Sequence, residues 1–271
     1  MNLATTVRLN NMVEIPQLGL GVFQTAASNE TETAVAAALK AGYRHIDTAA
    51  MYGNEESVGR ALKASGLDRN GVFITTKLAN DAHDDPRAAF DDSLRKLDCD
   101  YIDLYLIHWP VPQRLASWKV LEEIYTEGRV RAIGVANFLV HHLEELLNTA
   151  EVTPAVNQFE IHPFMQQPQL YDYCREQGIA VEAYGPLTQG KKLDNATLTA
   201  IATAHDKSSV QVLIRWSLQR GFIAIPKSVH PERIRSNTEV YNFELSAAEM
   251  DRINALNENV RLYPDPDRFS K

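Results

Sequence analysis

The fold is decided by a strand–helix–strand pattern that is clearest in residues 72–109, "VFITTKLANDAHDDPRAAFDDSLRKLDCDYIDLYLIHW". Both ends of this stretch, 72–78 and 101–109, are short apolar runs rich in β-branched and aromatic residues, which predict buried strands. The segment 85–97 between them has helical periodicity, and Pro86 falls in its first turn, where a missing backbone N–H does no harm. The stretch therefore predicts two strands joined by a helix.

The same unit recurs along the whole chain. Strand-like runs lie at 15–22, 43–47, 72–78, 101–109, 130–136, 154–160, 179–184 and 221–228, and helical segments, the first capped by Asn29, lie between them. Eight such units with no linker or change in composition predict one domain, residues 1–271, of the α/β class, folded as a (β/α)8 TIM barrel. A doubly wound open sheet is the competing fold, but it usually has fewer strands or a second domain.

Three segments depart from a plain barrel. Residues 7–15, with Asn10 and Asn11 between apolar runs, predict a β-hairpin before the first barrel strand. Two extra helices are expected, because 195–206 and 208–221 both lie between the last two strands and 246–257 adds a further helix near the C-terminus. The tail 261–271 is expected to be a surface segment.

Composition restricts the classes of function. The net charge of −8 argues against nonspecific binding to nucleic acid, and no apolar run is long enough to span a membrane. The N-terminus has no apolar segment of the kind found in signal peptides. Cys99 and Cys174 lie far apart, which is typical of a reduced, cytoplasmic protein.

In a barrel of this kind, functional side chains lie at the C-terminal ends of the strands and in the loops that follow. Each strand end after the first carries a polar or aromatic group there. These groups are Asp47, Tyr52, Lys77, His108, Trp109, Asn137, Gln158, Glu160, Tyr184 and Lys227. The active site is therefore expected at this rim.

Four of these residues, Asp47, Tyr52, Lys77 and His108, could form a proton donor. A free tyrosine, with a pKa of ~10, is a poor acid at neutral pH, and a nearby ammonium group would lower that pKa. A buried Lys77 needs an acceptor, and Asp47 is the natural one. His108 could orient a carbonyl group by donating a hydrogen bond. Together the four residues predict protonation of the oxygen formed when a carbonyl is reduced.

Other interpretations remain open at this point. Taken singly, Lys77 could be a surface lysine and His108 an ordinary polar residue at a barrel mouth. A desolvated lysine in a barrel could also form a Schiff base, as in class I aldolases. Residues 224–237 predict an anion site, since Lys227 and Ser228 end the last strand before a helix starts near Pro231. That anion could belong to a sugar phosphate or to a dinucleotide.

No metal site is predicted. The sequence "HHLEE" at 141–145 lacks the HExxH spacing, and His141 and His142 are expected on different faces of their helix.

With these residues in view, the sequence resembles the aldo-keto reductases over nearly its whole length. The segments "GYRHIDTAAMYGNEESVG" (42–59) and "IPKSVHPERIRSN" (225–237) fit two long signatures of that family. The bacterial 2,5-diketo-D-gluconate reductases are the most similar subgroup. The resemblance implies a monomeric, NADPH-dependent reductase of small carbonyl compounds on a (β/α)8 barrel, and it assigns the anion site to the cofactor.

The resemblance also implies a role for each residue. Tyr52 would be the general acid, supported by Asp47, Lys77 and His108. The cofactor would be bound by Asn137 and Gln158 at the carboxamide, Tyr184 at the nicotinamide ring, Lys227, Ser228 and Arg233 at the 2′-phosphate, Asn237 at the adenine, and by Gly185, Leu187, Gln189 and Val229. The substrate pocket would be formed by Phe23, Ala49, Met51, Ala79, Asn80 and Trp109.

Three positions differ from the family's usual pattern. Ala136 removes a hydroxyl beside the carboxamide, at a loss of about 1 kcal/mol. Ala79 replaces a common tryptophan, and Ser236 a glutamate that contacts adenine. The short segment after Trp109 and the short tail imply an open mouth and broad selectivity. The family also includes non-catalytic channel subunits, but the docking segment expected of those is absent from this sequence.

Overall fold

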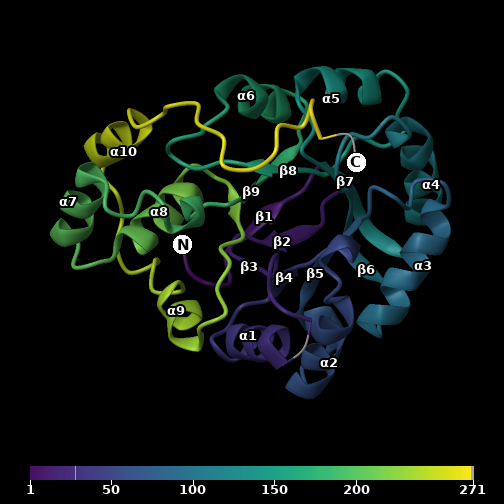
Figure 1. The fold of residues 1–271 in the computed structure, drawn as a ribbon, viewed down its shortest axis with the longest axis horizontal. Coiled ribbons are helices and arrows are strands. Elements are labelled where there is room, and N and C mark those ends of the chain that lie inside the picture. The colour runs from purple at the N-terminus through teal and green to yellow at the C-terminus, as the bar shows by residue number, and fades with distance from the viewer. Residues whose placement is uncertain (28, 270–271) are drawn as a thin grey trace.

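The computed structural model describes residues 1–27 and 29–269, in which eight parallel strands form one curved sheet, confirming the predicted barrel (Figure 1). In chain order the strands are β3 (Leu20–Gly21), β4 (His45–Asp47), β5 (Phe73–Leu78), β6 (Ile102–Ile107), β7 (Val130–Ala136), β8 (Val156–Glu160), β9 (Ala180–Tyr184) and β10 (Ile223–Ala224). Two parallel bridges, Leu18 with Ala224 and Gly21 with Lys227, join the first strand region to the last and close the barrel.

The first and last strands are shorter than the sequence predicts. The run 15–22 is divided, because Glu14–Pro16 forms strand β2 of a separate antiparallel sheet and only Leu20–Gly21 joins the barrel. Strand β10 ends at Ala224, two residues before Pro226, which has no backbone N–H for a ladder. The carbonyl of Pro226 still accepts a hydrogen bond from Gly21 at 3.2 Å.

The predicted hairpin is present. Strands β1 (Thr6–Arg8) and β2 pair with Val7 opposite Ile15, and Figure 1 shows them across the centre of the barrel. Ile15 and Leu9 are buried and pack with interior side chains of the barrel strands, among them Leu104. The hairpin therefore plugs one end of the barrel, and the functional groups lie at the other.

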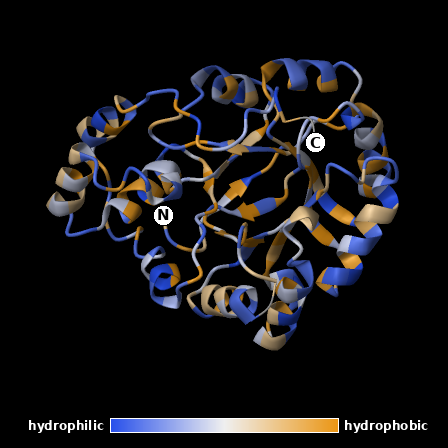
Figure 2. Cartoon of the chain, in the orientation of Figure 1, coloured by the Kyte–Doolittle hydropathy of each residue, from blue (hydrophilic) through white to orange (hydrophobic). Residues whose placement is uncertain are grey.

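Helices surround the sheet, with apolar faces toward it and polar faces outward (Figure 2). The helices that follow strands are α1 (Asn29–Lys40), α2 (Glu55–Ser65), α3 (Pro86–Leu97), α4 (Arg114–Thr126), α5 (Val140–Leu147), α6 (Pro168–Glu176), α8 (Ser209–Gln219) and α9 (Pro231–Ser236). The two extra helices are α7 (Ala196–Ala204) and α10 (Ala247–Asn254), which contact each other. Asn29, predicted to cap the first helix, is its first helical residue. None of the helices in the described part of the chain is long and apolar enough to cross a membrane.

Candidate active site

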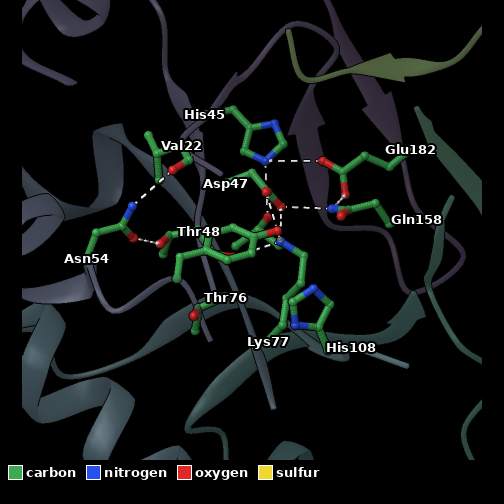
Figure 3. Close-up of polar contacts among 12 residues, drawn as sticks. Val22, His45, Asp47, Thr48, Asn54, Thr76, Lys77, His108, Gln158 and Glu182 are labelled. Carbon is green, nitrogen blue, oxygen red and sulfur yellow. Dashed lines mark hydrogen bonds and ion pairs between the residues drawn. The ribbon is translucent and has the colours of Figure 1, made fainter. Parts of the chain in front are cut away.

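The centre of the rim is a buried ion pair between β4 and β5 (Figure 3). Lys77 is fully buried, and its Nζ lies 2.8 Å from both carboxylate oxygens of Asp47. The same Nζ donates a hydrogen bond to the carbonyl of Thr48 at 2.7 Å. The two strands are neighbours, so parallel pairing brings both side chains to one end of the barrel.

Tyr52 lies above this pair, at the end of the short helix η1 (Ala50–Tyr52) that follows β4. Its hydroxyl oxygen is 3.5 Å from Nζ of Lys77, and its ring centroid is 5.1 Å from the same atom. Tyr52 is partly exposed, whereas Lys77 and Asp47 are buried. Of these three residues, Tyr52 is therefore the one that a molecule at the rim can reach.

His108 follows β6 and packs edge-on against Tyr52, with the ring centroids 5.6 Å apart. Burial, with a smaller contribution from Lys77, holds the pKa of His108 well below its usual value. The imidazole is therefore neutral at neutral pH and retains one N–H that can donate to a carbonyl oxygen.

The pKa of Tyr52 differs from the sequence-based expectation. The ammonium group of Lys77 was expected to lower it, but burial raises it well above the usual value, and the charge of Asp47 raises it further. The reason is that the charge of Lys77 is already balanced by Asp47 at 2.8 Å. Tyr52 therefore stays protonated at neutral pH, with its proton available for transfer.

Further buried polar groups adjoin the ion pair on the side of Gln158, and two of them, Glu182 and His45, were missed by the sequence analysis (Figure 3). Nε2 of Gln158 donates to Asp47 at 2.8 Å and to Glu182 of β9 at 2.9 Å. Oε1 of Glu182 is 3.5 Å from Nε2 of His45, and both side chains are fully buried. The available sequence signal was spacing, because His45 stands two residues before Asp47 and so shares its face of the strand.

Of the residues predicted to bind nicotinamide, Asn137 directly follows β7, Gln158 lies on β8 and Tyr184 ends β9. The amide nitrogen of Asn137 donates to the carbonyl of His108 at 2.9 Å, and its amide oxygen accepts from the hydroxyl of Tyr184 at 2.7 Å. Asn137 has a φ of 64°, a left-handed conformation that asparagine tolerates better than most residues. The structure therefore brings Asn137, Tyr184 and Gln158 to the same rim as Tyr52.

The predicted phosphate-binding residues lie at the end of β10 and in α9. Lys227 and Arg233 are exposed, and neither forms an ion pair within the described residues. Ser228 is buried, with its hydroxyl accepting from the backbone N–H of His230 at 3.2 Å, and Asn237 is the buried C-cap of α9. Two cations without a carboxylate partner, next to a hydroxyl group, fit an anionic group such as a phosphate.

All of these residues fall within one family match. The sequence model of the aldo/keto reductase family covers residues 17–258. The chain belongs to the aldo/keto reductase family.

Individual aldo/keto reductases are similar to this chain over its whole length. It is 52% identical to glyoxal reductase of Bacillus subtilis (strain 168) over 271 residues, 99% of this chain and 98% of that protein. It is 47% identical to methylglyoxal reductase DkgA of Escherichia coli (strain K12) over 270 residues, 98% of each. The solved structure of a Bombyx mori aldo-keto reductase in complex with NADP has a TM-score of 0.91 and 37% identity, covering 98% of this chain and 97% of that one. The predicted oxidoreductase class is confirmed.

Of the residues predicted to line the substrate pocket of this aldo/keto reductase, some lie at the surface around Tyr52 and one is buried beneath it. The ring of Phe23 lies 5.0 Å from that of Tyr52, and Met51 is exposed beside it. Trp109 lies next to His108, with ring centroids 6.4 Å apart. Ala49 is fully buried beneath this surface and offers nothing to a ligand, because its side chain is covered by its neighbours.

The C-terminal tail corrects the expectation of an open mouth. Phe269 packs against Trp109 with the ring centroids 4.2 Å apart, so the tail covers part of the predicted pocket. Further back, the buried carboxylate of Glu160 accepts the backbone N–H of Leu262 at 2.7 Å and of Tyr263 at 3.3 Å. The tail is short, but these contacts direct it across the rim. Residues 270 and 271 lie outside the described part.

The two adjacent histidines also differ from expectation. His141 and His142 were predicted on different helix faces, yet their Nε2 atoms lie 3.1 and 3.6 Å from the same Asp267 oxygen in the tail. Both residues are in the first turn of α5, where side chains can turn toward a segment crossing the helix end. Nδ1 of His142 accepts the backbone N–H of Leu139 at 3.2 Å, which places the ring hydrogen on Nε2, on the side of Asp267.

Proposed function

We propose that this aldo/keto reductase uses NADPH to reduce small aldehydes and dicarbonyl compounds to alcohols, with Tyr52 as the general acid. The observation that carries the proposal is the position of Tyr52, whose hydroxyl group lies 3.5 Å from a buried lysine that is itself paired with Asp47. A protonated phenol held over a buried ion pair is suited to giving a proton to a nascent alkoxide.

The residues at the rim fit a reduced dinucleotide. Lys227, Ser228 and Arg233 would hold its 2′-phosphate, and the exposed, unpaired state of the two cations within the described residues supports this assignment. Asn137 and Gln158 would hold the carboxamide, and Tyr184 would lie against the ring. Asn237, Gly185, Leu187, Gln189 and Val229 complete the proposed set. When bound, NADPH supplies a hydride to the carbonyl carbon of the substrate.

The protein's own groups handle the oxygen of the substrate. The neutral His108 donates a hydrogen bond that orients the carbonyl, and Tyr52 then transfers its proton to the oxygen as negative charge develops there. Lys77, whose Nζ lies 3.5 Å from that hydroxyl, is placed to donate a hydrogen bond to the phenolate oxygen that remains. Asp47 keeps that ammonium in place.

The Schiff-base alternative is disfavoured by the contacts of Lys77. A lysine nucleophile must be neutral, whereas Nζ of Lys77 donates to the carboxylate of Asp47 and the carbonyl of Thr48. Nζ is therefore engaged as a hydrogen-bond donor and is not free to attack a carbonyl carbon. A non-catalytic regulatory subunit is disfavoured as well, since the complete proton-donor arrangement would serve no purpose in it.

The substrate class is proposed from the pocket and the relatives together. The relatives named glyoxal reductase and methylglyoxal reductase are 52% and 47% identical to this chain. Phe269 packed on Trp109 narrows the mouth, which favours small dicarbonyls over larger keto sugars such as 2,5-diketo-D-gluconate. We further propose a cytoplasmic monomer that acts on small molecules and not on nucleic acid or membranes.

A reduction assay tests the proposal. NADPH consumption is followed with glyoxal, methylglyoxal, simple aldehydes and 2,5-diketo-D-gluconate, and the product is identified as the alcohol. Turnover with the dicarbonyls supports the proposal, and preference for the keto sugar would revise the substrate. Trapping a covalent substrate adduct on Lys77 with borohydride would overturn the hydride mechanism.

Arg233→Ala is expected to weaken NADPH binding much more than NADH binding. A guanidinium–phosphate contact contributes about 1.5–3 kcal/mol, so the dissociation constant for NADPH should rise about 10-fold or more. Fluorescence titration with both nucleotides measures this. Arg235→Ala is the matched control, because Arg235 pairs with Glu239 at 2.7 Å on the same helix. Equal losses for both nucleotides would exclude a contact between Arg233 and the 2′-phosphate.

A further inference from the structure

A fully buried carboxyl group, Glu182, lies inside the barrel and has no part in the proton transfer described above. It sits on β9 directly opposite Gln158 in the register of the sheet, and both its side-chain oxygens are shielded from solvent. Strand interiors of such a barrel usually hold branched apolar residues. Burying a carboxyl group there costs free energy, so its presence calls for a structural or functional explanation.

The surroundings of Glu182 show which form it takes. The basic group in contact with it among the described residues is His45, at 3.5 Å, and burial lowers the pKa of His45 to about 3, so that this imidazole is neutral. Burial, followed by repulsion from Asp47, raises the pKa of Glu182 to about 8. The hydrogen bond from Gln158 and, after it, the charge of Lys77 oppose this rise in the pKa without cancelling it. At neutral pH, Glu182 is therefore mainly the uncharged acid.

Glu182 is connected to the catalytic ion pair by a single atom. Nε2 of Gln158 has two hydrogens, and it donates one toward Glu182 at 2.9 Å and the other toward Asp47 at 2.8 Å (Figure 3). Without the acceptor on Glu182, one N–H of this buried amide would have no partner and the amide could rotate. Rotation would remove a hydrogen bond from the carboxylate that holds Lys77.

We propose that Glu182 is a positioning residue: through the amide of Gln158 it fixes Asp47, and thereby the Lys77 ammonium group, beneath the hydroxyl of Tyr52. The inference rests on the proposed carbonyl reduction. It adds a second consequence, because negative charge on Glu182 raises the pKa of Tyr52 and makes it a weaker acid. Charging Glu182 at alkaline pH therefore slows proton transfer.

The charged and titratable groups facing Glu182 come from three elements. They are His45 and Asp47 on β4, Lys77 on β5 and Tyr52 in η1. Burial lowers the pKa of His45 to about 3, so His45 is already neutral in this range. Burial raises the pKa of the Asp47 carboxyl as well as that of Glu182. A change in activity near pH 8 is therefore assigned to Glu182 only where Glu182→Gln removes it.

Two substitutions test the proposal with the full-length enzyme at saturating substrate. Glu182→Leu removes the acceptor, and kcat is expected to fall about 10-fold. Glu182→Gln keeps an acceptor for Gln158 and cannot ionise. It is expected to recover most of the kcat lost in the leucine variant, and to lack the decline in kcat that is expected of the wild type from pH 7 to 9.

Glu55→Gln is the matched control. Glu55 is also a buried acid with a pKa raised by burial, but it bonds to Thr76 at 2.6 Å and not to Gln158. Its variant is expected to keep the wild-type pH profile of kcat. A profile flattened equally in both variants would show a general effect of removing buried acids and would overturn the proposal.

Folding stability gives a readout independent of catalysis. Because the pKa of Glu182 is higher in the folded than in the unfolded chain, the free energy of unfolding should fall as pH rises from about 4.5 to 8. Glu182→Gln should reduce that fall.

A leucine variant with wild-type kcat, or a glutamine variant with the wild-type pH profile, would overturn the positioning role. Failure of the proposed function is recognised separately, because the wild type itself would then reduce no carbonyl substrate.

Discussion

Tyr52→Phe is expected to lower kcat for carbonyl reduction by about 10²–10⁴-fold, the range attributed to a positioned general acid. The phenylalanine ring keeps the packing against Phe23 and His108, so the pocket should retain its shape. Among the described residues, the hydroxyl has one hydrogen-bond partner, Nζ of Lys77 at 3.5 Å, and its removal should change stability little. Steady-state kinetics with the dicarbonyl substrate measures the loss.

Two measurements separate proton donation from damage to the site. NADPH affinity, measured by fluorescence titration, should stay within about twofold of the wild type, since Tyr52 is not among the proposed cofactor contacts. Tyr101→Phe serves as control, because that tyrosine lies over Arg69, away from the rim. Retention of full activity by Tyr52→Phe would assign the proton to another group.

Lys77→Met is expected to lower the free energy of unfolding by about 3–5 kcal/mol, the usual result when one partner of a buried ion pair is removed. Methionine nearly matches the lysine stem in volume, so little of the loss comes from packing. It comes from Asp47, which would remain buried without its cation at 2.8 Å. Chemical denaturation at pH 7 measures the change, and activity should be lost in parallel.

A double variant and a surface pair provide the controls. Adding Asp47→Asn to Lys77→Met removes the stranded charge and should restore much of the stability but none of the activity. Breaking the exposed pair of Lys63 and Asp98 by Lys63→Met should change stability far less, because water already solvates both charges. If Lys77→Met were no more destabilising than Lys63→Met, the buried pair would not be held as described.

Features set by local pattern could be predicted from the sequence. The alternation of apolar runs and helical segments predicted eight strands, and the asparagines at 10 and 11 marked the hairpin. The rim residues followed from the strand ends, since parallel strands in a barrel all end on one side. This is why Asp47 and Lys77 could be paired from sequence alone.

Features set by contacts between distant segments could not be predicted. Glu182 is hidden in an apolar strand run, and nothing in that run shows that Gln158 bridges it to Asp47. Phe269 meets Trp109 although 160 positions separate them. The pKa of Tyr52 was mispredicted for a related reason, because the net effect of Lys77 depends on how completely Asp47 neutralises it.

The closure of the barrel has a consequence for its motions. Strands β3 and β10 have two residues each and are joined by two bridges, whereas β5 and β6 share four paired positions. Backbone amides at this seam should exchange with deuterated solvent at a lower opening free energy than those of the central strands. Lys227, which takes part in one of these bridges, is also proposed to bind the 2′-phosphate of the cofactor. Nucleotide binding would then raise the free energy needed to open this seam, and amide exchange would slow on both β3 and β10.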